Sequence, residues 1–146
     1  MILIFLLYWK IIKFIKIIYI FQIIITQFLE SIFSGNQGYV ADLTTDTEGI
    51  GGAMYLLAEN VTLVNTIFVN NRAYFAGCIY INMNNQKNYL NFLGYNLTFA
   101  NNMADNTGGV ILFDADIMSA NVEIAMSAFI GNNATDCTIL NFLIEN

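Results

Sequence analysis

Hydrophobic residues are distributed differently in the first thirty residues and in the rest of the chain. Residues 1–30 are apolar almost throughout and present no polar face, with isoleucine as the commonest residue. After residue 35 the apolar runs are short, and glycine and asparagine recur every few residues, where they would interrupt a helix. No segment there keeps a helical periodicity. The sequence therefore predicts a hydrophobic N-terminal helix followed by a region of short β-strands.

The N-terminal segment, residues 1–30, also predicts a cellular location. Lys10, Lys13 and Lys16 precede an uncharged stretch of thirteen residues, Ile17–Leu29. This stretch is short for a membrane-spanning helix, which needs about 20 apolar residues, but it suits the apolar region of a secretory signal. A buried core helix would need apolar neighbours on all sides, which so small a domain cannot supply. We expect a cleaved signal peptide or an uncleaved signal-anchor, membrane contact through this segment, and a membrane or extracellular location.

An internal repeat organises the rest of the chain. Three segments, residues 60–73, 91–104 and 121–134, align without a gap. Four positions of the repeat hold one residue type in every copy: asparagine, phenylalanine, asparagine and alanine. These residues are Asn60, Asn91 and Asn121; Phe68, Phe99 and Phe129; Asn71, Asn102 and Asn132; and Ala73, Ala104 and Ala134.

A second block recurs between those segments and consists of a small-residue turn followed by apolar, strand-forming residues. It is found at residues 51–55, 76–80 and 108–112, with a partial copy at 136–140. The spacing between the two blocks varies, as expected when insertions lie in loops. Each unit should therefore contain a turn, a short strand, a variable loop and two further short strands.

Such units would coil into a solenoid whose neighbouring copies hydrogen-bond in parallel, about 4.8 Å apart. The phenylalanines would then form an inward aromatic ladder, and the asparagines would stack their amides at bends, each donating to the next copy. Glycine and alanine would mark close backbone packing or positive φ. An antiparallel sandwich of short strands is the alternative fold.

The two blocks, G-G-[AVC]-[IM]-[YL] and F-x-N-N-x-A, resemble the repeats of polymorphic outer-membrane proteins and related pectin-lyase-like surface proteins. The likeness covers residues 51–140, with departures at Ala76 and Cys137, where glycine is expected. The resemblance implies a right-handed parallel β-helix on an exported or surface-displayed chain. It implies adhesion or scaffolding as the role, without a catalytic residue set.

The expected fold class is therefore all-β: a right-handed parallel β-helix of about three coils, preceded by a hydrophobic N-terminal helix. The expected domains are a signal peptide or signal-anchor helix over residues 1–30, an acidic linker or decayed coil over 31–50, and β-helix repeats over 51–146. Residues 33–36 are the candidate remnant of an earlier copy. The repeats look incomplete at the C-terminal side, and the resulting open edge would invite a protein or glycan partner.

Charge and composition exclude several functions. The formal net charge is −6, and Arg72 and Lys87 are the basic residues beyond residue 30, so binding to nucleic acid is excluded. The chain contains no histidine, which removes imidazole acid–base chemistry, Ser-His-Asp triads and histidine metal sites. Two cysteines cannot form a four-thiolate zinc site. We expect no metal, no cofactor and no enzymatic activity.

Two acidic groups are candidates for chemistry. Asp114 and Asp116 follow a predicted strand and could bind a cation or act as an acid–base pair. The basic partner that such carbohydrate chemistry needs is missing nearby, so we interpret them as a solvated turn. Asp42, Asp46 and Glu48 lack the full spacing of a calcium loop and are interpreted as an acidic linker.

Cysteines and glycosylation sequons give further expectations. Cys78 and Cys137 lie two units apart and out of phase, so their Cα atoms should be about 10 Å apart, too far for a disulfide. We expect two reduced thiols that act as small core residues. Sequons begin at Asn60, Asn96 and Asn133. Asn60 should be shielded as a ladder residue, whereas Asn96 and Asn133 fall outside the repeating positions and should face solvent.

Three functional hypotheses follow. The first is a non-enzymatic, exported or membrane-anchored β-helix module with a structural or adhesive surface role. The second is a degenerate carbohydrate-active β-helix that binds or cleaves polysaccharide, although acidic sugars need cationic partners that are scarce here. The third is a small single-pass membrane protein.

Overall fold

The fold is all-β with parallel sheets. The computed structural model describes residues 18–38, 49–82, 89–114, 119–137 and 139–143, and the regular elements within them are all β-strands. These strands form three sheets, and each described pair of strands is parallel. The antiparallel sandwich is therefore wrong, because hairpin pairing is absent from the described residues.

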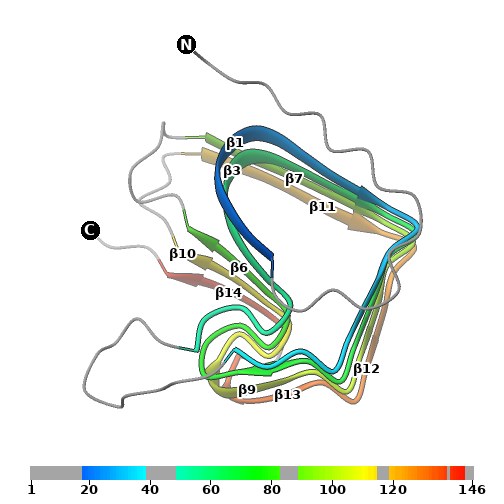
Figure 1. Cartoon of the computed structure of the whole chain (residues 1–146), viewed down its shortest axis with the longest axis vertical. Coiled ribbons are helices and arrows are strands. Elements are labelled where there is room, and N and C mark those ends of the chain that lie inside the picture. The colour runs from blue at the N-terminus through cyan, green and yellow to red at the C-terminus, as the bar shows by residue number, and fades with distance from the viewer. Residues whose placement is uncertain (1–17, 39–48, 83–88, 115–118, 138, 144–146) are drawn as a thin grey trace.

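The largest sheet has seven strands, arranged as two rows (Figure 1). The first row contains β1 (Ile18–Leu29), β3 (Met54–Val64), β7 (Tyr89–Tyr95) and β11 (Ser119–Ala125). The second row contains β6 (Ile79–Asn82), β10 (Ile111–Asp114) and β14 (Leu140–Leu143). Strand β3 joins the rows, because its start pairs with β6 and its end pairs with β7.

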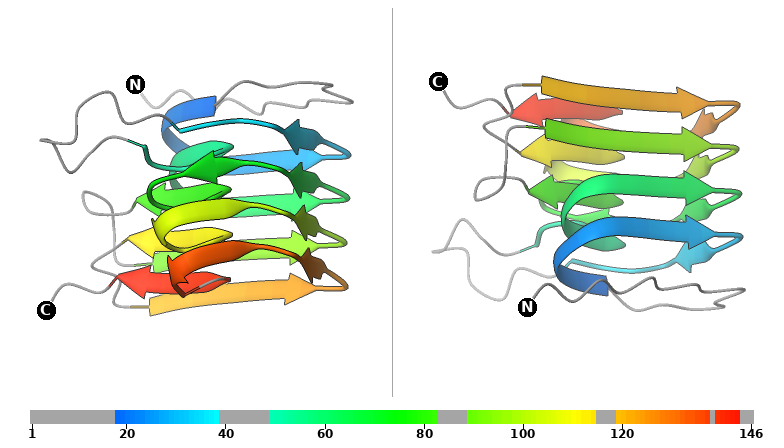
Figure 2. Two further views of the ribbon diagram at one scale, coloured as in Figure 1. Left: turned by 90° about the horizontal axis from the view of Figure 1, so that it is seen from below. Right: turned by 90° about the horizontal axis from the view of Figure 1, so that it is seen from above.

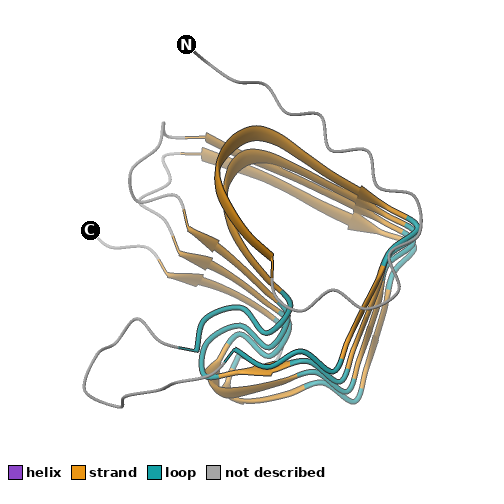
Figure 3. Ribbon diagram, viewed as in Figure 1, coloured by secondary structure: helices purple, strands orange, loops and turns teal. Residues whose placement is uncertain are grey.

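The two smaller sheets complete each pass of the chain. One contains β2 (Ile32–Ser34), β4 (Ile67–Val69), β8 (Thr98–Ala100) and β12 (Ala128–Ile130). The other contains β5 (Arg72–Ala73), β9 (Met103–Thr107) and β13 (Asn133–Asp136). Figure 3 shows the loops that join the sheets at the corners.

The chain visits these sheets repeatedly in the same order, so strands far apart in the sequence lie side by side (Figure 2). We call residues 18–38 the first pass, 50–73 the second, 76–82 with 89–107 the third, and 108–114 with 119–136 the fourth. Strand β14 begins another pass on β10. The passes lie in register, for example Phe68 opposite Phe99 and Phe99 opposite Phe129.

Each pass turns its corners through single residues with positive φ. Most of these positions hold glycine or asparagine, the residues that adopt this conformation at least cost. The three sets are Glu30, Asn65, Asn96 and Met126; Gly35, Asn70, Asn101 and Gly131; and Gly51, Ala76, Gly108 and Cys137. The repeated corners explain why asparagine and glycine recur along the sequence.

The recurring glycine of the second block is required by close backbone packing. A Cβ atom on Gly77 would lie 2.4 Å from the carbonyl oxygen of Gly109, and one on Gly52 would lie 2.1 Å from the carbonyl oxygen of Gly77. Both distances are far below van der Waals contact, so a side chain would push the stacked passes apart.

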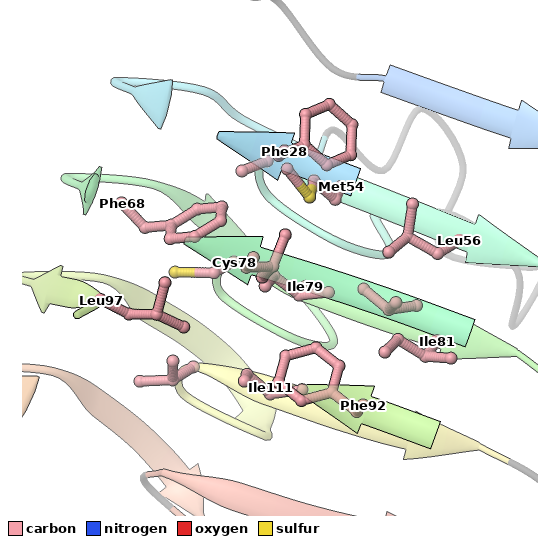
Figure 4. Packing of buried hydrophobic residues seen from close by; sticks show 14 of the residues in the cluster. Phe28, Met54, Leu56, Phe68, Cys78, Ile79, Ile81, Phe92, Leu97 and Ile111 are labelled. Atoms are coloured by element: carbon pink, nitrogen blue, oxygen red, sulfur yellow. The ribbon is translucent and has the colours of Figure 1, made fainter. Parts of the chain in front are cut away.

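The core lies between the sheets and continues from pass to pass. Figure 4 shows Phe68, Ile79 and Ile111, which come from three successive passes, gathered in this interior. All three side chains are fully buried. In β3 the alternation of buried residues shifts by one position at Glu59–Asn60, where the strand curls from the second row to the first. One continuous interior therefore serves all the passes.

The predicted N-terminal helix is wrong for the part of residues 1–30 that the structure describes. Ile18–Leu29 form strand β1, which pairs in parallel with β3 from Ile18 opposite Met54 to Leu29 opposite Val64. Isoleucine, which is abundant here, favours strands because its β-branched side chain packs well on a pleated surface. Residues 1–17 lie outside the described residues.

The described part of the chain contains no helix of the length and apolar character needed to cross a membrane.

Two boundaries differ from those expected from the repeat. Residues 31–38 continue the first pass, with Phe33 opposite Phe68. Near the C-terminal side, Ile111 pairs with Leu140, so Cys137 occupies the corner position of Gly108. The last copy of the second block therefore begins one residue later than the sequence predicts, at Cys137. Its loop is one residue longer than the sequence alignment allows.

Candidate functional site

The phenylalanines of the repeat form one column inside the molecule. Phe33, Phe68, Phe99 and Phe129 stack with centroid separations of 5.0, 4.9 and 5.0 Å and interplanar angles of 9°, 8° and 12°. The first three rings are fully buried, whereas Phe129 is half-buried. The structure thus brings Phe68, Phe99 and Phe129 together and adds Phe33. Each stacked pair contributes about 0.5–1.5 kcal/mol beyond its area burial.

A column of asparagine amides runs beside these rings, at the bend after the four-stranded sheet. The side-chain nitrogens of Asn36, Asn71 and Asn102 each donate to the side-chain oxygen of the next asparagine, at 2.9, 3.0 and 2.9 Å, and the last acceptor is Asn132. The backbone N–H groups of the same three residues donate to the same oxygens.

Each later amide of this column also binds the preceding pass. The side-chain nitrogens of Asn71, Asn102 and Asn132 donate to phenylalanine carbonyl oxygens at 3.1, 3.0 and 2.9 Å. Asn71 and Asn102 are buried. Their side-chain oxygens therefore satisfy the backbone N–H groups of Asn36 and Asn71, which would otherwise be buried without an acceptor.

The second asparagine series, Asn60, Asn91 and Asn121, is in register but lies within strands β3, β7 and β11. The prediction of stacking at bends is therefore wrong for this series. Asn121 is exposed, and its side-chain nitrogen donates 2.8 Å to the side-chain oxygen of Asn91, on the preceding pass. Asn60 is half-buried.

The sequon asparagines occupy different environments. Asn96 is exposed at a corner, and its side-chain nitrogen donates 2.9 Å to the side-chain oxygen of Asn65. Because Asn65 and Asn96 share one corner position, the prediction that Asn96 falls outside the repeat is wrong. The signal was present as two asparagines 31 residues apart. Asn133 is exposed in β13, and the hydroxyl of Thr135 in its sequon donates to the carbonyl oxygen of Asp105.

The two cysteines are both free, and they lie in different environments. Cys78 is buried in the core, and burial raises the pKa of its thiol. Cys137 is exposed at a corner with φ of 48°, so its expected role as a core residue is wrong. The shift in register described above moves it from an inward position to the turn.

Asp114 lies at the end of β10 and is engaged by a tyrosine. The hydroxyl of Tyr80 donates to the Asp114 carboxylate, and the Tyr80 ring stacks on Tyr55 with centroids 5.4 Å apart. Burial raises the pKa of Tyr80, and the hydrogen bond to Asp114 raises it further, so the phenol stays protonated and donates. Tyr55 and Tyr80 hold the same position of the second block, so the repeat could have predicted that their rings stack.

The remaining predicted acidic residues, Asp116, Asp42, Asp46 and Glu48, lie outside the described residues.

The described residues do not gather a reactive group of side chains. Arg72 forms an exposed ion pair with Asp105 at 2.7 Å. No cluster of three histidine, cysteine, aspartate or glutamate residues that could hold a metal ion occurs in the part of the chain the structure describes. The recurring polar side chains instead hydrogen-bond one pass to the next. The repeated residues therefore form contacts between successive passes of the chain.

No protein-family model matches the chain, and no curated protein or solved structure matches it.

Proposed function

We propose that this chain is a right-handed parallel β-helix module, exported or associated with a membrane, that has a structural or adhesive role at a surface and no enzymatic activity. The observation that carries the proposal is the use of the repeated polar side chains. The amides of the asparagine column, Asn36, Asn71, Asn102 and Asn132, hydrogen-bond one pass to the next. Side chains selected for stacking build a rigid scaffold, and its outer faces remain available for contact.

The β-helix is supported by the order of the strands. The chain returns to the first row after each pass, and each return lies in parallel register on the pass before it. Connections between parallel strands of one sheet are nearly always right-handed, which supports the proposed hand. The resemblance to surface repeats supports the same fold and remains a prediction.

We propose the absence of catalysis because the charged side chains that could take part in a reaction already bind other side chains. Arg72 is held by Asp105, and Asp114 accepts a hydrogen bond from Tyr80. A glycosidase needs two carboxyl groups at a defined separation across a bond. Asp114 with Asp116 remains the one pair that the sequence suggests.

A polysaccharide assay on the full chain tests this part of the proposal. Neutral and acidic polysaccharides would be incubated with the wild-type chain and with an Asp114→Asn/Asp116→Asn variant. We expect no shortening of any polysaccharide, and any binding should be equal for the two chains. Cleavage that the double variant abolishes would replace the proposal with the carbohydrate-active alternative.

The surface role has its own assay. Beads coated with the folded chain should be retained on immobilised cell-surface extracts at least several-fold better than beads coated with the urea-unfolded chain. Equal retention of both would contradict an adhesive role.

The proposed location rests on the three lysines and the apolar stretch that follows them. That stretch, Ile17–Leu29, overlaps β1, so a cleavage after it would remove the outer strand of the first pass. Expression in microsomes with and without a signal-peptidase inhibitor tests both points. We expect protection of the chain from added protease, and the mass of the protected chain reports whether β1 is retained. A chain fully digested outside the vesicles would contradict export.

A further inference from the structure

The corner between the first row and the four-stranded sheet is exposed on every pass (Figure 1). Its four described residues, Glu30, Asn65, Asn96 and Met126, all have positive φ, and all are exposed. The chain turns away from this corner in both directions, so side chains on it face solvent rather than the core. A group attached to one of these side chains would therefore extend outward without displacing a residue of the core.

One residue of this corner begins a glycosylation sequon, Asn96-Leu97-Thr98. The side-chain nitrogen of Asn96 donates 2.9 Å to the side-chain oxygen of Asn65. An asparagine amide carries two N–H hydrogens, and this bond uses one of them. The sequon at Asn60 differs, because Asn60 is half-buried within β3 and has β1 and β7 paired on its two sides. The folded chain therefore presents the amide of Asn96 more openly than that of Asn60.

Exposed apolar side chains lie around Asn96. Tyr95 precedes it in the chain and is 49% exposed, and Met126 holds the same corner position on the next pass and is 75% exposed. Ile67 lies opposite Thr98 of the sequon and is 38% exposed. Apolar groups that gather on a surface favour aggregation unless something covers them. Because sugars are bulky and rich in hydroxyl groups, a glycan on Asn96 would cover this patch with a soluble group.

We infer that Asn96 is the acceptor of an N-linked glycan, which covers the apolar patch formed by Tyr95, Ile67 and Met126. The inference rests on the proposed export, since this modification belongs to secreted chains. The co-reactant is an oligosaccharide linked through pyrophosphate to a lipid. Nδ2 of Asn96 forms a bond to C1 of the first sugar while the bond from C1 to the pyrophosphate oxygen breaks. The amide loses one proton, and the lipid pyrophosphate leaves.

The folded structure is compatible with the glycosylated product. The modified amide of Asn96 keeps one N–H, which can still donate to the side-chain oxygen of Asn65. The backbone N–H of Asn96 donates to the carbonyl oxygen of Ala125, and the modification does not alter this bond. The contacts that join the third pass to its two neighbours at this corner therefore remain.

The test translates the full chain in microsomes and measures the mass that an endoglycosidase removes. Thr98→Ala destroys the sequon but keeps Asn96 and its bond to Asn65, and it should remove one glycan. Thr98→Ser preserves the sequon and should keep that glycan. Thr62→Ala destroys the half-buried sequon at Asn60 and should leave the number of glycans unchanged. A Thr98→Ala chain that carries as many glycans as the wild-type chain overturns the inference.

Protease protection of the same samples distinguishes a failure of this inference from a failure of the proposed export. A chain that is protected inside the vesicles but carries no glycan on Asn96 overturns the inference and leaves export standing. A chain that is digested outside the vesicles overturns both.

The covering role of the glycan has a separate readout in the purified chain. Trimming the glycan with the endoglycosidase should lower the protein concentration at which the chain aggregates at least several-fold. In an Ile67→Ser/Met126→Ser variant, which removes exposed apolar groups of the patch, trimming should have little effect. Aggregation that trimming leaves unchanged in the wild-type chain contradicts the covering role.

Discussion

The third and fourth passes place the same residues in the same columns, yet they bury them to different extents. Phe99 and Asn102 have a stacked neighbour on both sides and are at most 1% exposed. Phe129 and Asn132 have a described neighbour on one side and are half-buried. In a stack, each repeat gains stability from its own contacts and from each neighbouring repeat. The column in which a residue lies thus determines its type. The number of neighbouring passes determines how much that residue stabilises the fold.

The largest expected difference concerns the phenylalanine column. Phe99→Ala removes a fully buried ring with neighbours on both faces and should lower the free energy of unfolding by about 3–5 kcal/mol. Phe129→Ala removes the half-buried end ring and should cost about half as much, since water already reaches that site. Urea unfolding of the full chain measures both. Equal losses would show that the fourth pass is covered as well as the third.

The asparagine column should show the same asymmetry at a smaller scale. Asn102→Ala leaves the backbone N–H of Asn71 buried without a partner, and it removes a side-chain donor from the carbonyl oxygen of Phe68. We expect a loss of about 2–3 kcal/mol, because unsatisfied buried groups cost about 1–3 kcal/mol each. Asn132→Ala should cost about 1 kcal/mol, since solvent can replace its amide. Asn102→Asp serves as a control that keeps the acceptor for Asn71 and removes the donor to Phe68.

The strands and columns were predictable from the sequence because stacking requires identical residues in phase. Phe68, Phe99 and Phe129 share one position of the repeat, and the structure stacks them. The first pass was harder to predict. Its apolar residues fit a membrane segment as well as a strand, and periodicity alone does not separate the two when every residue is apolar. Phe33 and Asn36 carry the phenylalanine and asparagine positions of the repeat into this pass.

The candidate site was less predictable, because it depends on contacts between side chains of different passes. Asn96 shares its position in the repeat with Asn65, but the role of that position is visible only at the corner where the two amides bond. The bond between Tyr80 and Asp114 joins residues 34 apart, and Asp114 lies two residues beyond the second block, opposite Asn82. The prediction for Cys137 is wrong because a short alignment does not reveal a one-residue difference in loop length. Local insertions move side chains between inward and outward positions, and only the strand register records them.

A further contrast concerns the two thiols at high pH. Burial holds the pKa of Cys78 above its value in the unfolded chain, which is about 8.5. The stability from keeping this thiol neutral is present below that value and is lost as the pH rises above it, by at most about 1.4 kcal/mol per pH unit. Urea midpoints measured from pH 7 to 9.5 should fall less steeply for Cys78→Ala than for Cys137→Ala. Identical slopes would mean that Cys78 does not titrate in this way.

The smallest effect should come from Arg72, the neighbour of Asn71 in the chain. Asn71 points into the stack and is fully buried. Arg72 points outward and pairs with Asp105 on the next pass. Both partners are exposed, so water and salt screen their attraction and the side chains lose entropy when they pair. Arg72→Gln should therefore leave the urea midpoint unchanged within error, in low and in high salt. The matched substitution one residue earlier, Asn71→Gln, adds a methylene group and moves a buried amide away from its hydrogen-bond partners. It should lower the urea midpoint measurably. If Arg72→Gln were the more damaging of the two, the exposed pair rather than the buried amides would hold the passes together.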